Sequence, residues 1–108
     1  MIIEENIERA VDFLRDTAKE YGQLKGHSVY CEKNLSRVKA LEMLNISEGS
    51  MASREAQAYG SESYRAAIVE LQNATAEYET LRAQRDAAAI KIDVWRSQAS
   101  AKSKGIDL

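Results

Sequence analysis

Apolar and small residues recur every three or four positions along two long stretches of this chain, and this spacing constrains the fold more than any other feature. Steps of three and four follow one face of an α-helix, as they do in a coiled coil. The absence of proline and the 30% of charged residues also suit a protein made of long helices. The first stretch predicts a helix from about residue 3 to about residue 45. Its apolar face would hold Ile3, Ile7, Ala10, Leu14, Thr17, Tyr21, Leu24, Ser28, Cys31, Leu35 and Val38.

The second stretch repeats the pattern and predicts a helix from about residue 62 to about residue 101, followed by a frayed tail over 102–108. Its apolar face would hold Tyr64, Ala67, Leu71, Ala74, Tyr78, Leu81, Arg85, Ala88, Ile92, Trp95 and Ala99. The matched lengths favour an antiparallel hairpin, an all-α fold that forms a single domain over residues 1–108. The charges agree, because residues 1–20 hold six acids against three bases and residues 80–104 hold six bases against two acids. An antiparallel hairpin lays these oppositely charged ends side by side.

The segment between the two long helices predicts a corner that contains a short third helix over about residues 51–59. In "NISEGSMA" (45–52), Gly49 can adopt the left-handed conformation that ends a helix, and Ser47 or Ser50 can cap the next helix. We expect Gly60 to close the short helix with a positive φ. Ser61 then caps the second long helix, whose first turn holds Glu62, where the helix dipole favours an acid.

A two-helix hairpin of this size buries too little apolar surface to be stable alone. Val11, Ala18, Val29, Leu41 and Ile68 widen the two apolar stripes beyond what one partner helix covers. We therefore expect the hairpin to dimerise with a second copy of itself into a four-helix arrangement, since two-fold dimers are the commonest oligomers.

Composition argues against several classes of function. The net charge of -2 provides no general attraction for nucleic acid, and the single cysteine, Cys31, excludes an internal disulfide. The first ten residues, "MIIEENIERA", look like neither a signal peptide nor a membrane anchor. No stretch approaches the roughly 20 apolar residues of a membrane-spanning helix. A soluble protein of the cytoplasm, without membrane contact, is the expectation.

Chemistry-bearing residues are few, so we expect no enzyme, no catalytic residues, no cofactor and no metal. His27 is the only histidine, and among its helical neighbours only the thiol of Cys31 could join it as a ligand. Cys31 lies one helical turn from His27, so the two side chains can touch. A nucleophilic thiol needs a third group and an electropositive setting, whereas a buried small side chain explains Cys31 equally well.

Residues 51–98 resemble a family of small, uncharacterised helical proteins encoded by tailed bacteriophages and prophages. The resemblance is carried by Arg54, Glu55, Ala56, Tyr59, Tyr64, Leu81, Arg82, Ile92, Trp95, Arg96, Ser97 and Gln98, within "REAQAY" and "EYETLRAQRDAAAIKIDVWRSQ". It implies a phage accessory protein in the cytoplasm of a bacterial host. Members are often encoded beside early recombination and replication genes, which implies a link to DNA recombination or replication. The family defines no catalytic residues.

The residues that could contact a partner form one basic concentration, namely Arg82, Arg85, Arg96, Lys102 and Lys104. Two functions follow. The first is a non-enzymatic accessory protein that binds an unidentified phage or host protein. The alternative is a protein that binds DNA directly through these residues in the second long helix. Against the alternative, acids of the first helix would neutralise the same residues, and Arg85 needs a carboxylate partner if it is buried. Trp95 can anchor a partner, but packing against Ile3 and Ile7 explains it structurally.

Overall fold

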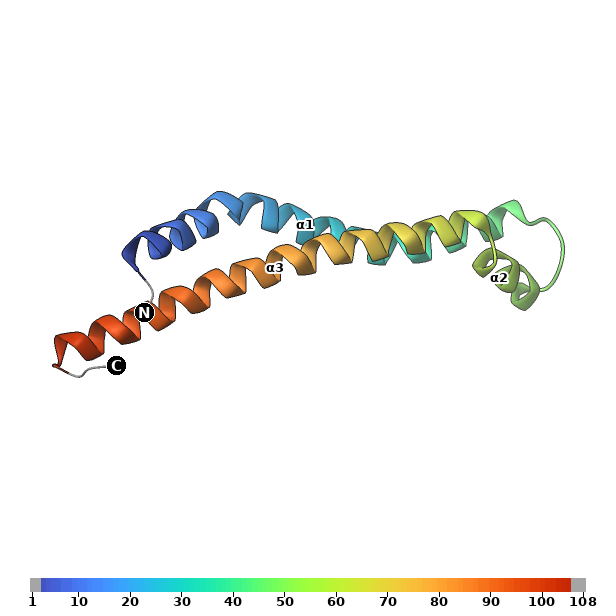
Figure 1. Cartoon of the computed structure of the whole chain (residues 1–108). Coiled ribbons are helices and arrows are strands. Elements are labelled where there is room, and N and C mark those ends of the chain that lie inside the picture. Colours follow the sequence, from blue (N-terminus) through green and yellow to red (C-terminus); the bar gives the residue numbers. More distant parts are fainter. Residues whose placement is uncertain (1–2, 106–108) are drawn as a thin grey trace. The chain divides into compact units, whose positions relative to one another are not determined.

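The computed structural model describes residues 3–105, and this range contains three helices and no strand (Figure 1). They are α1 (Glu4–Asn45), α2 (Met51–Tyr59) and α3 (Glu62–Ser103). The predicted all-α hairpin with a short corner helix is confirmed. The observed helix boundaries lie within two residues of the predicted ones. Of the tail, residues 106–108 lie outside the described range.

Contacts divide the chain into two compact units. Unit 1 consists of Met1–Gly22 and Glu79–Leu108, and unit 2 consists of Gln23–Tyr78. In each unit a segment of α1 pairs with a segment of α3 that runs in the opposite direction, and unit 2 also contains α2. One hairpin domain over residues 1–108 stays a prediction.

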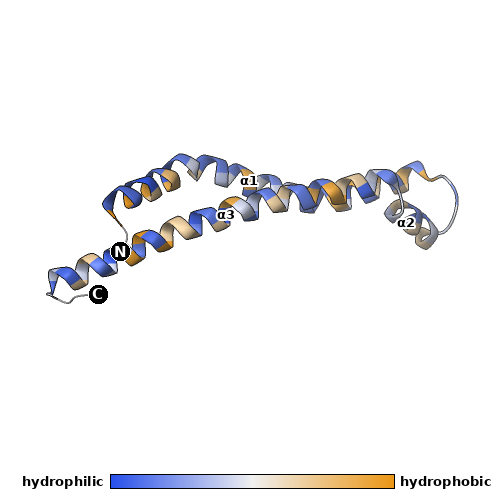
Figure 2. Ribbon diagram, in the orientation of Figure 1, coloured by the Kyte–Doolittle hydropathy of each residue, from blue (hydrophilic) through white to orange (hydrophobic). Residues whose placement is uncertain are grey.

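The predicted apolar faces are the sides on which α1 and α3 meet, and orange bands recur along both helices in Figure 2. Every member of the α1 face except Ile3 is buried or half-buried, and so is every member of the α3 face except Ala99. The buried side chains are mostly small: Ala10, Cys31, Ala58, Ala67, Ala74 and Ala88, together with Ile7 and Leu81. Small side chains let two helices approach closely, so each unit has a narrow core. The residues expected to widen the stripes (Val11, Ala18, Val29, Leu41 and Ile68) are exposed.

Side-chain caps hold both ends of the corner. Ser50 Oγ accepts a hydrogen bond of 3.1 Å from the Ser53 N–H at the start of α2. Ser61 Oγ accepts a hydrogen bond of 3.2 Å from the Tyr64 N–H and donates one of 2.7 Å to the Ala58 carbonyl. One hydroxyl therefore satisfies the end of α2 and the start of α3 together, which confirms Ser61 as the predicted cap.

The two glycines of the corner differ from each other. Gly49 has a φ of 102°, in the left-handed region, as predicted. Gly60 has a φ of -87° and a ψ of 0°, so the prediction of a positive φ at Gly60 was wrong. The chain turns there because ψ departs from the helical value and because Ser61 caps the next helix. A residue with a side chain can adopt the Gly60 conformation.

These two conformations predict opposite effects for the same substitution. Gly49→Ala should lower the free energy of unfolding by about 1 kcal/mol or more, because its left-handed conformation is strained for a residue with a Cβ. The new Cβ would also lie 3.2 Å from Ser53 Oγ. Gly60→Ala should raise the free energy of unfolding by about 0.4 to 1 kcal/mol, since alanine restricts the unfolded chain more than glycine does. Urea melts measure both, and a strongly destabilised Gly60→Ala protein would contradict this description of the corner.

Candidate functional site

Among the predicted contact residues, Arg85 is directed from α3 toward α1, within unit 1. Its guanidinium Nη1 donates to the Leu14 carbonyl at 2.7 Å and to Thr17 Oγ1 at 2.6 Å. The guanidinium carbon also lies 4.9 Å from the centre of the Tyr21 ring. The expectation of a carboxylate partner was therefore wrong, because a backbone carbonyl, a hydroxyl and a ring share the cation instead. Arg85 joins α3 to α1 and is not free to contact a ligand.

The other four predicted contact residues are exposed and lie along α3 or just after it. Arg82 pairs with Glu79 at 3.5 Å and Arg96 with Asp93 at 3.8 Å, both within one turn of the same helix. Lys102 lies in the last turn of α3, and Lys104 follows the helix. Acids expected to face these bases from α1 pair along α1 instead, as Glu5 does with Arg9 and Asp12 with Arg15. The five basic residues therefore do not share one surface, because Arg85 faces α1.

Trp95 lies where the sequence placed it, beside Ile7 in unit 1. It is half-buried and lines a shallow hollow with Glu4, Ile7, Glu8, Val11 and Asp12. Ile3, the other expected neighbour, remains 56% exposed. The position of Trp95 supports its structural role in the pairing of α3 with the start of α1.

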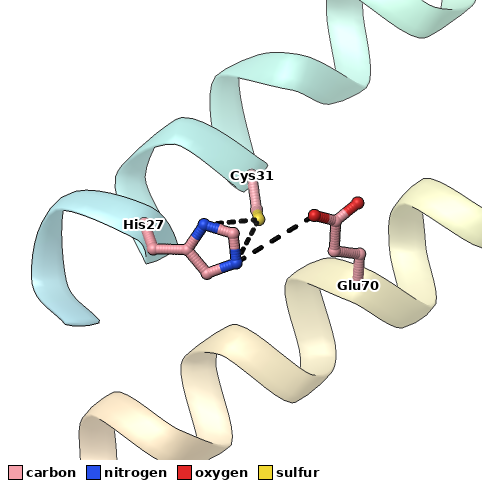
Figure 3. Close-up of side chains that lie close together, drawn as sticks. All are labelled: His27, Cys31 and Glu70. Carbon is pink, nitrogen blue, oxygen red and sulfur yellow. Dashed lines mark hydrogen bonds and ion pairs between the residues drawn. The ribbon is translucent and has the colours of Figure 1, made fainter. Parts of the chain in front are cut away.

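Unit 2 brings together three side chains that are common metal ligands (Figure 3). His27 and Cys31 come from consecutive turns of α1, and Glu70 points toward them from α3. Cys31 Sγ lies 3.7 Å from His27 Nε2, which in turn lies 4.0 Å from Glu70 Oε1. Sequence reasoning missed Glu70 because it searched only the neighbours of His27 along one helix. Aligning the two predicted helices as an antiparallel hairpin could have placed Glu70 beside His27 and Cys31.

The thiol in this cluster is not set up as a nucleophile. Cys31 is 2% exposed. Burial raises the pKa of its thiol, and the nearby Glu70 carboxylate raises this pKa further through its charge and a hydrogen bond. A thiol with a raised pKa holds little reactive thiolate at neutral pH. Glu70 supplies a third polar group beside Cys31 and His27, but it raises the pKa of the thiol, whereas a nucleophilic thiol needs a lowered pKa.

A second polar cluster in unit 2, formed by Lys39, Glu55 and Tyr59, connects α2 to α1 through hydrogen bonds. Lys39 Nζ donates to Glu55 Oε1 at 2.9 Å and to the Tyr59 hydroxyl at 3.0 Å. The Tyr59 ring packs edge-on against Tyr64, with ring centres 5.2 Å apart. Glu55, Tyr59 and Tyr64 are among the residues that carry the phage-family resemblance. Their contacts here are structural, since they position the corner.

The Lys39 cluster makes a prediction about pH. The hydrogen bond from Lys39 and its charge lower the pKa of the Glu55 carboxyl below its ordinary 4.5. A carboxyl with a lowered pKa in the folded state stabilises the fold above its ordinary pKa and loses that effect as the pH falls through the folded pKa. Glu55→Gln should therefore lower the urea midpoint at pH 7, and the difference from the wild type should vanish toward about pH 2.

The exposed Glu48 supplies the control, because Glu48→Gln changes the charge equally. It should leave the midpoint almost unchanged at both pH values. A Glu55→Gln protein whose deficit is the same at pH 7 and at pH 2 would contradict the role given to the carboxylate.

On the side of α3 away from the buried face, a series of uncharged residues spaced three and four apart runs from Ala66 to Ala101, with charged residues such as Arg65, Glu79 and Lys91 beside it. In unit 1 this outer face consists of Thr80, Ala83, Ala87, Ile90, Val94, Ser97 and Ala101, and in unit 2 of Ala66, Val69, Asn73 and Ala76. These residues repeat the spacing of three and four, and all but the half-buried Ala101 are exposed. Ile90 is 60% exposed and Val69 is 45% exposed. Sequence reasoning missed this outer face, although the spacing that revealed the buried face repeats here, offset along the helix.

The corresponding outer face of α1 is different. It carries Glu5, Arg9, Asp12, Asp16, Lys19, Gln23, Gly26, Tyr30, Lys33 and Arg37, most of which are charged. A charged face is typical of a surface that stays in water, whereas an uncharged face with large apolar side chains is typical of a contact surface. The two helices of the hairpin are therefore not equivalent on the outside.

Comparison with known proteins adds no family assignment. No protein-family model, no curated protein and no solved structure matches the chain. Among the described residues, no helix is both long enough and apolar enough to cross a membrane.

Proposed function

We propose that this chain is a non-enzymatic accessory protein that acts through protein–protein interaction, and that its first partner is a second copy of itself. The observation that carries the proposal is the uncharged, exposed outer face of α3. Small residues alternate there with larger ones such as Val69, Ile90 and Val94, so another helix can approach closely. The buried, poorly ionised thiol of Cys31 supports a role other than catalysis.

The charges along α3 favour an antiparallel pairing of two copies. Between residues 62 and 79 the helix holds four acids and one base, whereas residues 82–104 hold six bases and two acids. When two α3 helices pair in opposite directions, the acidic half of each lies beside the basic half of the other. Such a two-fold dimer is a four-helix arrangement with the two α3 helices at its centre. It also gives Arg82 and Arg96 a role as contact residues at the edge of the interface.

The phage setting is the broader part of the proposal. The resemblance of residues 51–98 to phage and prophage proteins supports a role in the cytoplasm of an infected bacterium. A phage or host protein that works in recombination or replication is then the second partner. The dimer would present its α1 faces and corner helices to that protein.

A substitution in the outer face of α3 tests the proposal. Ile90→Glu should weaken the dimer at least about tenfold, because each copy then places a carboxylate in the apolar contact, beside the acidic half of the other α3 helix. Leu44→Glu is the matched control, since Leu44 is 80% exposed and lies on α1. It should leave the dimer intact. Light scattering at a series of concentrations measures both, and circular dichroism checks that each variant keeps its helices.

Two results would contradict the proposal. The first is an Ile90→Glu protein that remains helical and dimerises as well as the Leu44→Glu protein. The second is tight DNA binding that weakens steeply with salt and is lost in an Arg82→Glu, Lys102→Glu variant. That outcome would favour the nucleic-acid alternative and assign the basic residues to phosphate contacts.

A further inference from the structure

We propose that His27, Cys31 and Glu70 form a binding site for a divalent transition-metal ion of the zinc class, with water in the fourth position. The three residues lie within unit 2 and come from both long helices, two from α1 and one from α3. The site is separate from the outer face of α3 and goes beyond the proposed function.

The distances between the donor atoms are close to those of a tetrahedral site. Zinc lies about 2.3 Å from a thiolate sulfur and about 2.0 to 2.2 Å from an imidazole nitrogen or a carboxylate oxygen. At the tetrahedral angle these lengths place sulfur and nitrogen about 3.6 Å apart, and nitrogen and oxygen about 3.4 Å apart. The corresponding separations are 3.7 Å from Cys31 Sγ to His27 Nε2 and 4.0 Å from His27 Nε2 to Glu70 Oε1. All three ligand atoms lie within 4.8 Å of one another, so small side-chain rotations would complete the site.

The donor set selects the class of ion. A thiolate and an imidazole together favour borderline ions such as Zn²⁺ and Co²⁺ over Mg²⁺ and Ca²⁺, which prefer oxygen ligands. The thiolate and the carboxylate carry two negative charges and would neutralise the ion. A bound cation would also stabilise the thiolate form of Cys31.

The burial pattern leaves an approach for the ion. The side chains of His27 and Glu70 are 49% and 53% exposed, while the sulfur lies beneath them in the core. An ion can therefore bind the two exposed ligands first and then the thiolate. Once bound, it would connect α1 to α3 and resist their separation in unit 2. The expected effect of the metal is a hairpin that unfolds at a higher temperature.

Metal titration of the full chain tests the site. The probes are Zn²⁺, followed by calorimetry, and Co²⁺, followed by absorption, because thiolate ligation of Co²⁺ gives charge-transfer bands in the near ultraviolet. We expect one ion per chain, the thiolate band, and a higher melting temperature with Zn²⁺. His27→Gln and Glu70→Gln should each weaken binding at least about tenfold, since even residues behind the ligands typically cost 10- to 100-fold.

Matched controls separate this site from adventitious binding to a thiol. Glu77→Gln makes the same charge change at an exposed position of α3 in unit 2 and should bind both ions like the wild type. Cys31→Ser should lose the charge-transfer band. His27 and Glu70 are half-exposed, so their variants should keep the fold, which circular dichroism checks. Binding that depends on Cys31 alone and is unchanged in His27→Gln and Glu70→Gln would overturn the proposal, as would the absence of Co²⁺ thiolate bands in the wild type.

Discussion

Leu81→Ala is expected to lower the free energy of unfolding by about 2 to 5 kcal/mol, because the substitution removes buried methyl groups and leaves a cavity. Leu81 is 7% exposed and is the only leucine among the buried residues of the described range. Most of the other buried residues are alanines, which cannot expand to fill such a space. The hairpin has few large buried side chains, so each contributes a large share of its stability.

The measurement is a urea melt at one fixed protein concentration, because association also affects the apparent stability. Leu44→Ala is the matched control, since Leu44 is 80% exposed. We expect it to change the free energy of unfolding by no more than about 0.5 kcal/mol. If the two variants lose similar amounts of stability, Leu81 does not belong to the core that holds α1 and α3 together.

Ala74→Leu is the converse experiment and should lower the free energy of unfolding by about 1 to 3 kcal/mol through overpacking. Ala74 is 3% exposed and lies on the face where α3 meets α1 in unit 2. A larger side chain there must either adopt a strained rotamer or push the two helices apart.

The exposed Ala89 on the same helix provides the comparison. Ala89→Leu should leave the free energy of unfolding almost unchanged in the same urea melts. An Ala74→Leu protein that is as stable as the wild type would mean that the helices are not closely packed at this point, against the narrow core described here.

The sequence was sufficient to predict the helices and the faces on which they meet. The spacing of residues such as Ile7, Ala10, Ala74 and Leu81 reports directly which side of a helix is buried, because burial follows the helical period. Ser61 was predictable for a similar reason, since capping depends on residue type and on position at a helix start.

Contacts between the helices were harder to predict. The partners of Arg85 are a carbonyl, a hydroxyl and a ring on α1, and nothing in the sequence marks a backbone carbonyl as available. Glu70 was missed beside His27 and Cys31 because its proximity depends on the register of the hairpin. Gly60 was assigned a positive φ from residue type alone, although glycine also adopts ordinary conformations.

The exposed apolar surface was predicted only in part. Val11 and Ile68 were expected to widen the stripes beyond what one partner helix covers, and both are exposed in the hairpin. The larger uncharged surface runs along the outer face of α3, where Val69 and Ile90 lie. When a helix carries apolar residues on two opposite faces, the sequence pattern of a single apolar face is weak. The second face of α3 therefore became evident only after the first was known to pack against α1.

The mass of the wild-type chain in solution tests the central claim most directly, namely that the hairpin associates with itself through α3. Light scattering at micromolar concentration should give a mass near twice 12.1 kDa that falls on dilution. A mass of 12.1 kDa at every concentration would contradict the claim.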